Sequence, residues 1–92
     1  MDQDRLRLVI DLITQTTDLL YQENIEQAYK ILPAVLQELE TAIFVIEDES
    51  VQAEMKEQLL EALRAMEEND YILLADIMQY EINERLLESV EG

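Results

Sequence analysis

Carboxylates are the residues of this sequence whose spacing could support chemistry. Acids recur three or four positions apart, so one helix face carries several oxygens, which a hard cation could bind. Two rows have this spacing: Glu54, Glu57 and Glu61, and Glu81, Glu84 and Glu88. Both rows fall mostly off the apolar stripes of their helices, as is typical of a solvated face. We therefore expect no metal site at either row.

The other residues that catalysis commonly uses are missing. The chain has no histidine and no cysteine, which excludes the commonest general base, Ser–His and Cys–His arrangements, and zinc or di-iron sites of the usual kind. The acidic segments 47–49 and 67–70 lack the alternating ligands and central glycine of a calcium loop. We expect no catalytic residue, no cofactor and no metal, and therefore no enzyme.

Asp76 is the one acid in an apolar setting, because it lies between Ala75 and Ile77. A buried aspartate needs a partner or a raised pKa. Buried unpaired acids are rare, so we expect Asp76 to point outward from its helix.

Composition predicts a single helical domain over residues 1–92. Apolar residues make up 49% of the chain and charged residues 30%, a balance typical of globular proteins. Glycine and proline occur once each, so the residues that tight turns and sheet corners require are almost absent. Helices with short polar connections are expected.

The net charge of −16 repels phosphate backbones and anionic lipid headgroups, which argues against direct binding to nucleic acid or a membrane surface. The longest apolar runs, 42–46 and 71–75, are far too short to span a bilayer. We expect a cytoplasmic protein. The acidic coat is interpreted mainly as solubilising, although it would also steer a basic protein partner.

Apolar residues recur at steps of three and four in four segments, which predicts four helices. Their expected ranges are 4–21, 25–46, 51–66 and 71–88. The connections are about two to four residues long, so sequential helices must lie antiparallel. The predicted fold is all-α: an up-down-up-down four-helix bundle made of two tandem helical hairpins.

Local signals refine the second and third helices. Asn24 followed by Gln27 is typical of a capping box, and Asp48 or Ser50 is expected to cap the third helix. Pro33 has no N–H to donate to the carbonyl of the residue four positions earlier, so the second helix is expected to be kinked or broken there.

Two further sequence patterns concern charge and repetition. Glu26 with Lys30 and Glu81 with Arg85 have the order that favours an ion pair one helical turn apart. The segments 22–24 and 67–69 resemble each other, which an internal duplication or a shared turn geometry explains equally well.

A surplus of apolar residues lies at the end of the second helix and the start of the fourth, at opposite ends of such a bundle. One inward stripe cannot bury both runs, so some of Phe44, Val45, Ile72 and Leu73 should be exposed. We hypothesise that they form a two-fold dimer interface or a contact with a partner helix. The candidate interface residues are Phe44, Val45, Tyr71, Ile72, Leu73, Ile77 and Tyr80.

Two strings, Gln22 to Ala28 and Asp70 to Glu81, resemble segments of a family of small, acidic, uncharacterised bacterial helical-bundle proteins. More loosely, the chain is similar in architecture to flagellar export-chaperone-like bundles, which are small, helical and acidic and bind partner helices. The second resemblance implies an adaptor or chaperone-like role.

Two functional classes remain. The first is a non-catalytic protein-interaction module that binds an apolar helix, or a second copy of itself, through exposed apolar surface. The alternative is an acidic mimic of nucleic acid that sequesters a basic DNA-binding protein. Binding that survives high salt would favour the first class, and binding that high salt abolishes would favour the second.

Overall fold

A computed structural model describes residues 3–91, and these residues contain helices but no strands. Its elements are α1 (Gln3–Tyr21), α2 (Ile25–Phe44), α3 (Glu49–Glu67), α4 (Tyr71–Asp76), η1 (Ile77–Ile82) and α5 (Asn83–Glu91). The last three follow one another without a break and are called here the fourth helix. The predicted helix ranges agree with these bounds to within three residues.

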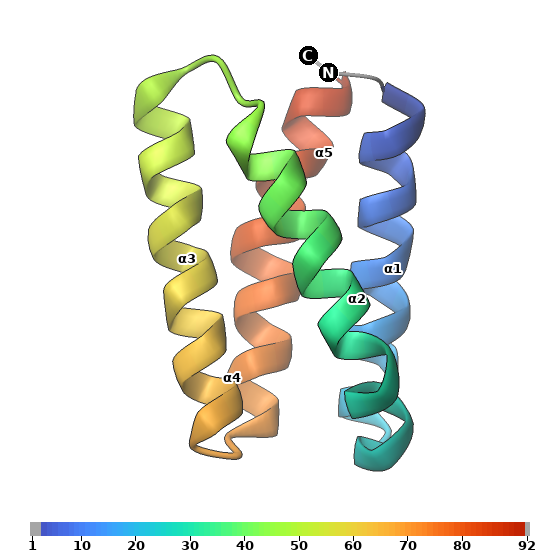
Figure 1. Cartoon of the computed structure of the whole chain (residues 1–92). Helices are drawn as coiled ribbons and strands as arrows, with labels where there is room; N and C mark the ends of the chain where they lie inside the picture. Colours follow the sequence, from blue (N-terminus) through green and yellow to red (C-terminus); the bar gives the residue numbers. More distant parts are fainter. Residues whose placement is uncertain (1–2, 92) are drawn as a thin grey trace.

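The four helices run alternately up and down, as predicted (Figure 1). Helix α1 packs against α2 and against the fourth helix, and α3 packs mainly against the fourth helix. Helices α2 and α3 contact each other much less. In Figure 1 they meet at their shared connection and diverge toward the opposite end of the bundle.

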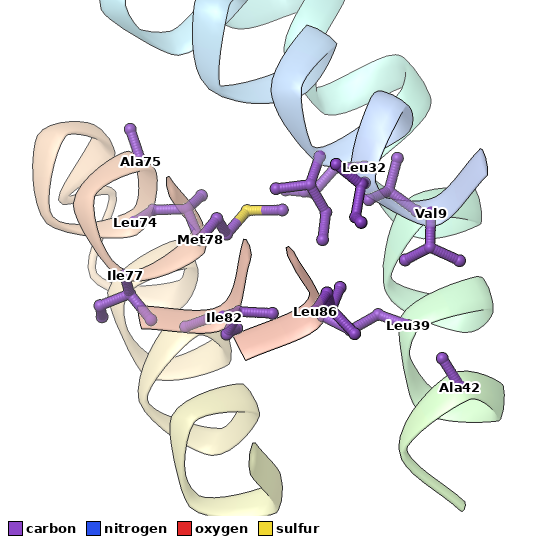
Figure 2. Close-up of a cluster of buried hydrophobic side chains, with 14 of the residues drawn as sticks. Val9, Leu32, Leu39, Ala42, Leu74, Ala75, Ile77, Met78, Ile82 and Leu86 are labelled. Carbon is purple, nitrogen blue, oxygen red and sulfur yellow. The ribbon is translucent and has the colours of Figure 1, made fainter. Parts of the chain in front are cut away.

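The core lies between the four helices, and all of them contribute apolar side chains to it. Figure 2 shows the facing side chains of Val9, Leu32, Leu39, Met78 and Leu86, all of which are buried. Full burial of such a side chain stabilises a fold by about 1.5–3 kcal/mol. The spacing of three and four in the sequence thus serves to point one stripe of each helix at this core.

The first and third connections have the same geometry. In each, a residue with positive φ follows the helix end: Glu23 at 61° and Asn69 at 57°. The next amide donates back to the carbonyl five residues earlier, Asn24 N to Leu19 O at 2.9 Å and Asp70 N to Ala65 O at 2.9 Å. This is the Schellman arrangement of helix C-termini. The residues that occupy equivalent positions in the two turns, such as Asn24 and Asp70, are 46 positions apart. The similar strings 22–24 and 67–69 are 45 positions apart. The two connections therefore share a turn geometry, but their similar residues do not occupy equivalent positions in it.

The caps differ from one helix to another. Asp48 caps α3, since its carboxylate accepts from the amides of Ser50 and Val51, as one of the two alternatives predicted. The side chain of Asn24 makes no capping hydrogen bond, so the predicted capping box is wrong. Gln52 adds a contact that the sequence did not suggest: its amide donates to the carbonyls at the end of α2, Ile43 O at 3.1 Å and Phe44 O at 3.2 Å.

Pro33 does not break the second helix, because α2 continues from Ile25 to Phe44 with the proline inside it. The proline is exposed, while Leu32 and Val35 on either side of it are buried. Burial on both sides of the proline holds the two halves of α2 on the same core.

The irregularity that does occur is in the fourth helix, where η1 is a π-helical turn. At its end the amide of Asn83 donates to the carbonyl of Met78, five residues earlier rather than four. The first two residues of this turn, Ile77 and Met78, are both buried in the core.

Candidate interaction surface

Five of the seven candidate interface residues are exposed. Phe44 is 63% exposed and Tyr80 is 64% exposed. The other three are Val45, Ile72 and Leu73. The predicted exposure of Phe44, Val45, Ile72 and Leu73 is therefore confirmed. Whether these residues contact a partner stays a prediction.

The remaining two candidates are not on the surface to the same degree. Ile77 is only 3% exposed and belongs to the core, so its assignment to an exposed interface is wrong. Tyr71 is half-buried, with its ring edge-on to that of Tyr29 at a centroid distance of 5.7 Å. The burial of Ile77 and the contact between Tyr71 and Tyr29 are both part of the packing within the bundle.

The exposed candidates do not share one hollow; Tyr80, for example, lines one with Glu54 and Arg85. Phe44 lies at the α2 side of a groove shared with α3. Leu73 lines a different hollow, between α3 and the fourth helix, together with Glu61 and Arg64. Helix α3 separates the two hollows, so no single surface contains both predicted runs.

An apolar groove runs between α2 and α3, which contact each other least among neighbouring helices. We call it the α2–α3 groove. Two adjoining hollows, which share Glu40, Leu59 and Leu63, make it continuous. Its lining comprises Pro33, Leu36, Gln37, Glu40, Ile43 and Phe44 from α2, and Lys56, Leu59, Leu60, Leu63 and Met66 from α3.

Among the residues that line the groove, only Phe44 was a predicted interface residue, and Leu60 is the most exposed leucine among the others. It is 59% exposed and lies beside Leu59 and Leu63. A usable signal was present, because consecutive leucines in a helix point about 100° apart and one inward stripe cannot hold both.

Two charged side chains mark the groove. The ammonium group of Lys56 lies 5.5 Å from the centroid of the Phe44 ring, a cation–π contact at one end. Glu40 lines both hollows. Within residues 3–91 its carboxylate forms no ion pair. The groove thus has a free negative charge in its middle.

Asp76 is half-buried, so the outward orientation predicted for it is only partly realised. The hydroxyl of Tyr21 donates to its Oδ1 at 2.6 Å, joining α1 to the fourth helix. Partial burial raises the pKa of Tyr21 above its ordinary value, and the neighbouring Asp76 carboxylate raises it further. Asp76 therefore has a specific partner at the surface.

A partly buried polar layer joins α1 to the fourth helix. Thr17 Oγ1 donates to Gln79 Oε1 at 3.1 Å, and Asn83 Nδ2 donates to Thr14 Oγ1 at 3.3 Å. The Oδ1 of Asn83 accepts no hydrogen bond from the described residues. The layer contains no titratable group, so it offers no general base to activate a threonine hydroxyl.

The predicted ion pairs are realised in part. Glu26 and Lys30 lie 3.9 Å apart. Arg85 does not pair with Glu81; its guanidinium contacts Glu54 on α3 and Glu88 on its own helix. Glu81 lies in the π-helical turn, where the spacing of four no longer brings two side chains together. Glu54, which accepts a hydrogen bond, raises the pKa of Arg85.

Within the described part of the chain, no group of three or more carboxylates is placed to hold a metal ion. Across the same residues, no helix is both long and apolar enough to cross a membrane.

Comparison with known proteins places the chain in a family. The family model described as a domain of unknown function (DUF8042) matches residues 3–91. The chain belongs to this family. The DUF8042 match covers all four helices and both sides of the α2–α3 groove. No curated protein and no solved structure matches the chain.

Proposed function

We propose that this DUF8042 domain is a non-catalytic protein-interaction module, adaptor or chaperone-like, that binds its partner through exposed apolar helix surface. The α2–α3 groove is the observation that supports the proposal. Single exposed apolar residues are ordinary, but contiguous ones lining a concave surface are typical of binding sites. In the groove, Phe44 and Leu60 from facing helices are both more than half exposed.

Affinity capture from the native host, with matched surface variants, tests this function. The groove variant combines Phe44→Ser with Leu60→Ser. The control is Leu8→Ser, which removes an apolar side chain of similar exposure, 51%, from α1. We expect the wild type and the control to retain the same partner and the groove variant to lose it. Thermal melts of all three proteins check that each is folded.

The salt dependence of capture separates this proposal from its alternative. An acidic nucleic-acid mimic is favoured by the net charge of −16, and its binding to a basic protein would collapse in high salt while remaining insensitive to Phe44 and Leu60. That result would contradict the interaction module. Retention in high salt, together with loss in the groove variant, would support it.

A further inference from the structure

This inference rests on the proposed function and names the partner. We infer that the α2–α3 groove receives one short amphipathic helix of a partner protein, whose apolar stripe is flanked by lysine or arginine. The apolar side chains of the partner helix pack on Leu59 and Leu63 of the groove. One of its basic side chains forms an ion pair with Glu40. The shape of the groove, its charge and the charge of the whole chain support this occupant.

The shape of the groove fits a helix of about three turns. Residues 33 to 44 of α2 span its length, which is about 16 Å at a rise of 1.5 Å per residue. Leucines from α3 and Leu36 from α2 supply apolar contacts along this distance. A helix with apolar residues at positions i, i+3 or i+4, i+7 and i+11 presents a stripe of about the same length.

The charge of the groove selects a basic partner. Glu40 lies where the two hollows join and has no ion-pair partner among the described residues. The charged residues that line the groove itself are Glu40 and Lys56. Helix α2 as a whole contains three acids and one base, and α3 contains five acids and two bases, so both helices are net acidic. Lys56 is engaged with the Phe44 ring at one end. The basic residues of the partner therefore belong near the middle of the groove, beside Glu40.

Charge also argues against a second copy as the occupant. Each copy carries a net charge of −16, and a symmetric contact through the groove would bring the two Glu40 walls toward each other. The negative electrostatic field of the chain attracts a basic helix, whereas it makes two copies of the chain repel each other.

The test uses a synthetic fourteen-residue peptide (length chosen from the groove span) with leucines at positions 3, 6, 7, 10 and 14 and lysines beside that stripe. One control peptide has the same composition in an order that destroys the stripe, and another has glutamate in place of lysine. Binding to the full chain is followed by NMR of its leucine methyl groups at physiological salt. We expect the striped lysine peptide to shift the methyl signals of Leu36, Leu59 and Leu63 and the two control peptides to leave them unchanged.

Variants of the chain then locate the contact. Leu60→Ser and Glu40→Lys should each weaken binding about tenfold, since a buried leucine or a charge pair contributes on that scale. Leu8→Ser and Asp11→Lys, which make the same chemical changes on the exposed face of α1, should leave the affinity within about twofold.

Several outcomes would overturn the inference. Equal binding of the scrambled peptide, equal effects of Glu40→Lys and Asp11→Lys, or methyl shifts outside the groove would each do so. Sedimentation that reveals a dimer with shifted groove methyl signals would assign the groove to self-association instead. If capture from the host depends on Phe44 and Leu60 but the striped peptide does not bind the groove, this inference fails while the proposed function stands. If capture does not depend on those residues, the proposed function itself fails.

Discussion

At the scale of single residues, Tyr21 has an unusual hydrogen-bond partner and Glu23 has an unusual backbone conformation. Tyr21 donates to the Asp76 carboxylate at the surface. Glu23 occupies the left-handed region, with φ of 61°, where glycine or asparagine is the usual residue. Both settings affect the free energy of unfolding, and each can be tested with one substitution.

Replacing Tyr21 with phenylalanine should flatten the loss of stability at alkaline pH. The pKa of Tyr21 is raised in the folded state above its ordinary value of 10.0, so folding favours the protonated hydroxyl. The resulting stability is full below pH 10 and is lost as the pH rises above it. Urea unfolding at a series of pH values should therefore give a steeper alkaline decline for the wild type than for Tyr21→Phe. Burial also raises the pKa of Tyr29, so both proteins should keep a residual loss of stability at alkaline pH. Identical curves for the two proteins would contradict the prediction.

Replacing Glu23 with glycine should stabilise the domain by about 0.5–1 kcal/mol. The left-handed conformation costs a residue with a Cβ atom about 1–2 kcal/mol, and the greater freedom of glycine in the unfolded chain offsets part of the gain. Denaturant unfolding measures the change. Glu23→Gln keeps the Cβ atom and removes only the charge, so it should raise the free energy of unfolding less than Glu23→Gly does. Asn69→Gly at the equivalent position should also gain less, since asparagine tolerates this conformation.

At the scale of elements, the spacing of apolar residues predicted the four helices and their order, because burial of one stripe per helix decides both. The π-helical turn was not predictable from that spacing. In the structure, Gln79 in this turn and Asn83 directly after it bond to Thr17 and Thr14 of α1, and such contacts between helices leave no trace in the apolar pattern. The pairing expected between Glu81 and Arg85 is not formed, because Glu81 lies within this turn.

The α2–α3 groove could not be predicted from the sequence either. Exposure of Phe44 could be predicted from a local excess of apolar residues. The participation of Leu59 and Leu63 in a groove depends on the unequal packing of four helices, with α2 directed toward α1 and α3 toward the fourth helix. No pattern within one helix contains that information.

Replacing Pro33 with alanine should raise the free energy of unfolding by about 2 kcal/mol. A proline inside a helix costs about 3 kcal/mol relative to alanine, and its restriction of the unfolded chain returns about 0.4–1 kcal/mol. Alanine restores an amide that can donate to the carbonyl of Tyr29. Chemical denaturation measures the gain. A variant no more stable than the wild type would show that α2 already compensates for the missing bond.

At the scale of the whole molecule, 22 acids and six bases share one small surface. Four ion pairs link residues of the described chain, among them Arg5 with Glu38 at 2.7 Å between α1 and α2. Such exposed pairs contribute little individually. The many acids outside these pairs repel one another, and this repulsion opposes folding.

Moderate salt should therefore raise the Tm. Screening shortens the reach of charge repulsion to about 10 Å at 0.1 M ionic strength, and each kcal/mol of repulsion relieved raises the Tm of a domain of this size by about 4–8 °C. Melts at low and physiological salt measure the effect. A variant combining Asp11→Asn, Glu23→Gln and Glu40→Gln should show a smaller rise. A Tm that stays constant or falls with salt would contradict the prediction.

The weak contact between α2 and α3 has a consequence for motion. Each of these helices has its main support on the far side, so they can separate locally while the rest of the bundle stays folded. Such partial openings require less free energy than global unfolding. Amide hydrogens near the connection from Val45 to Asp48 should then exchange with solvent sooner than those in the middle of α1. A partner helix thicker than the resting groove would have to wait for this opening, and the rate of its association would be limited by the domain itself rather than by diffusion.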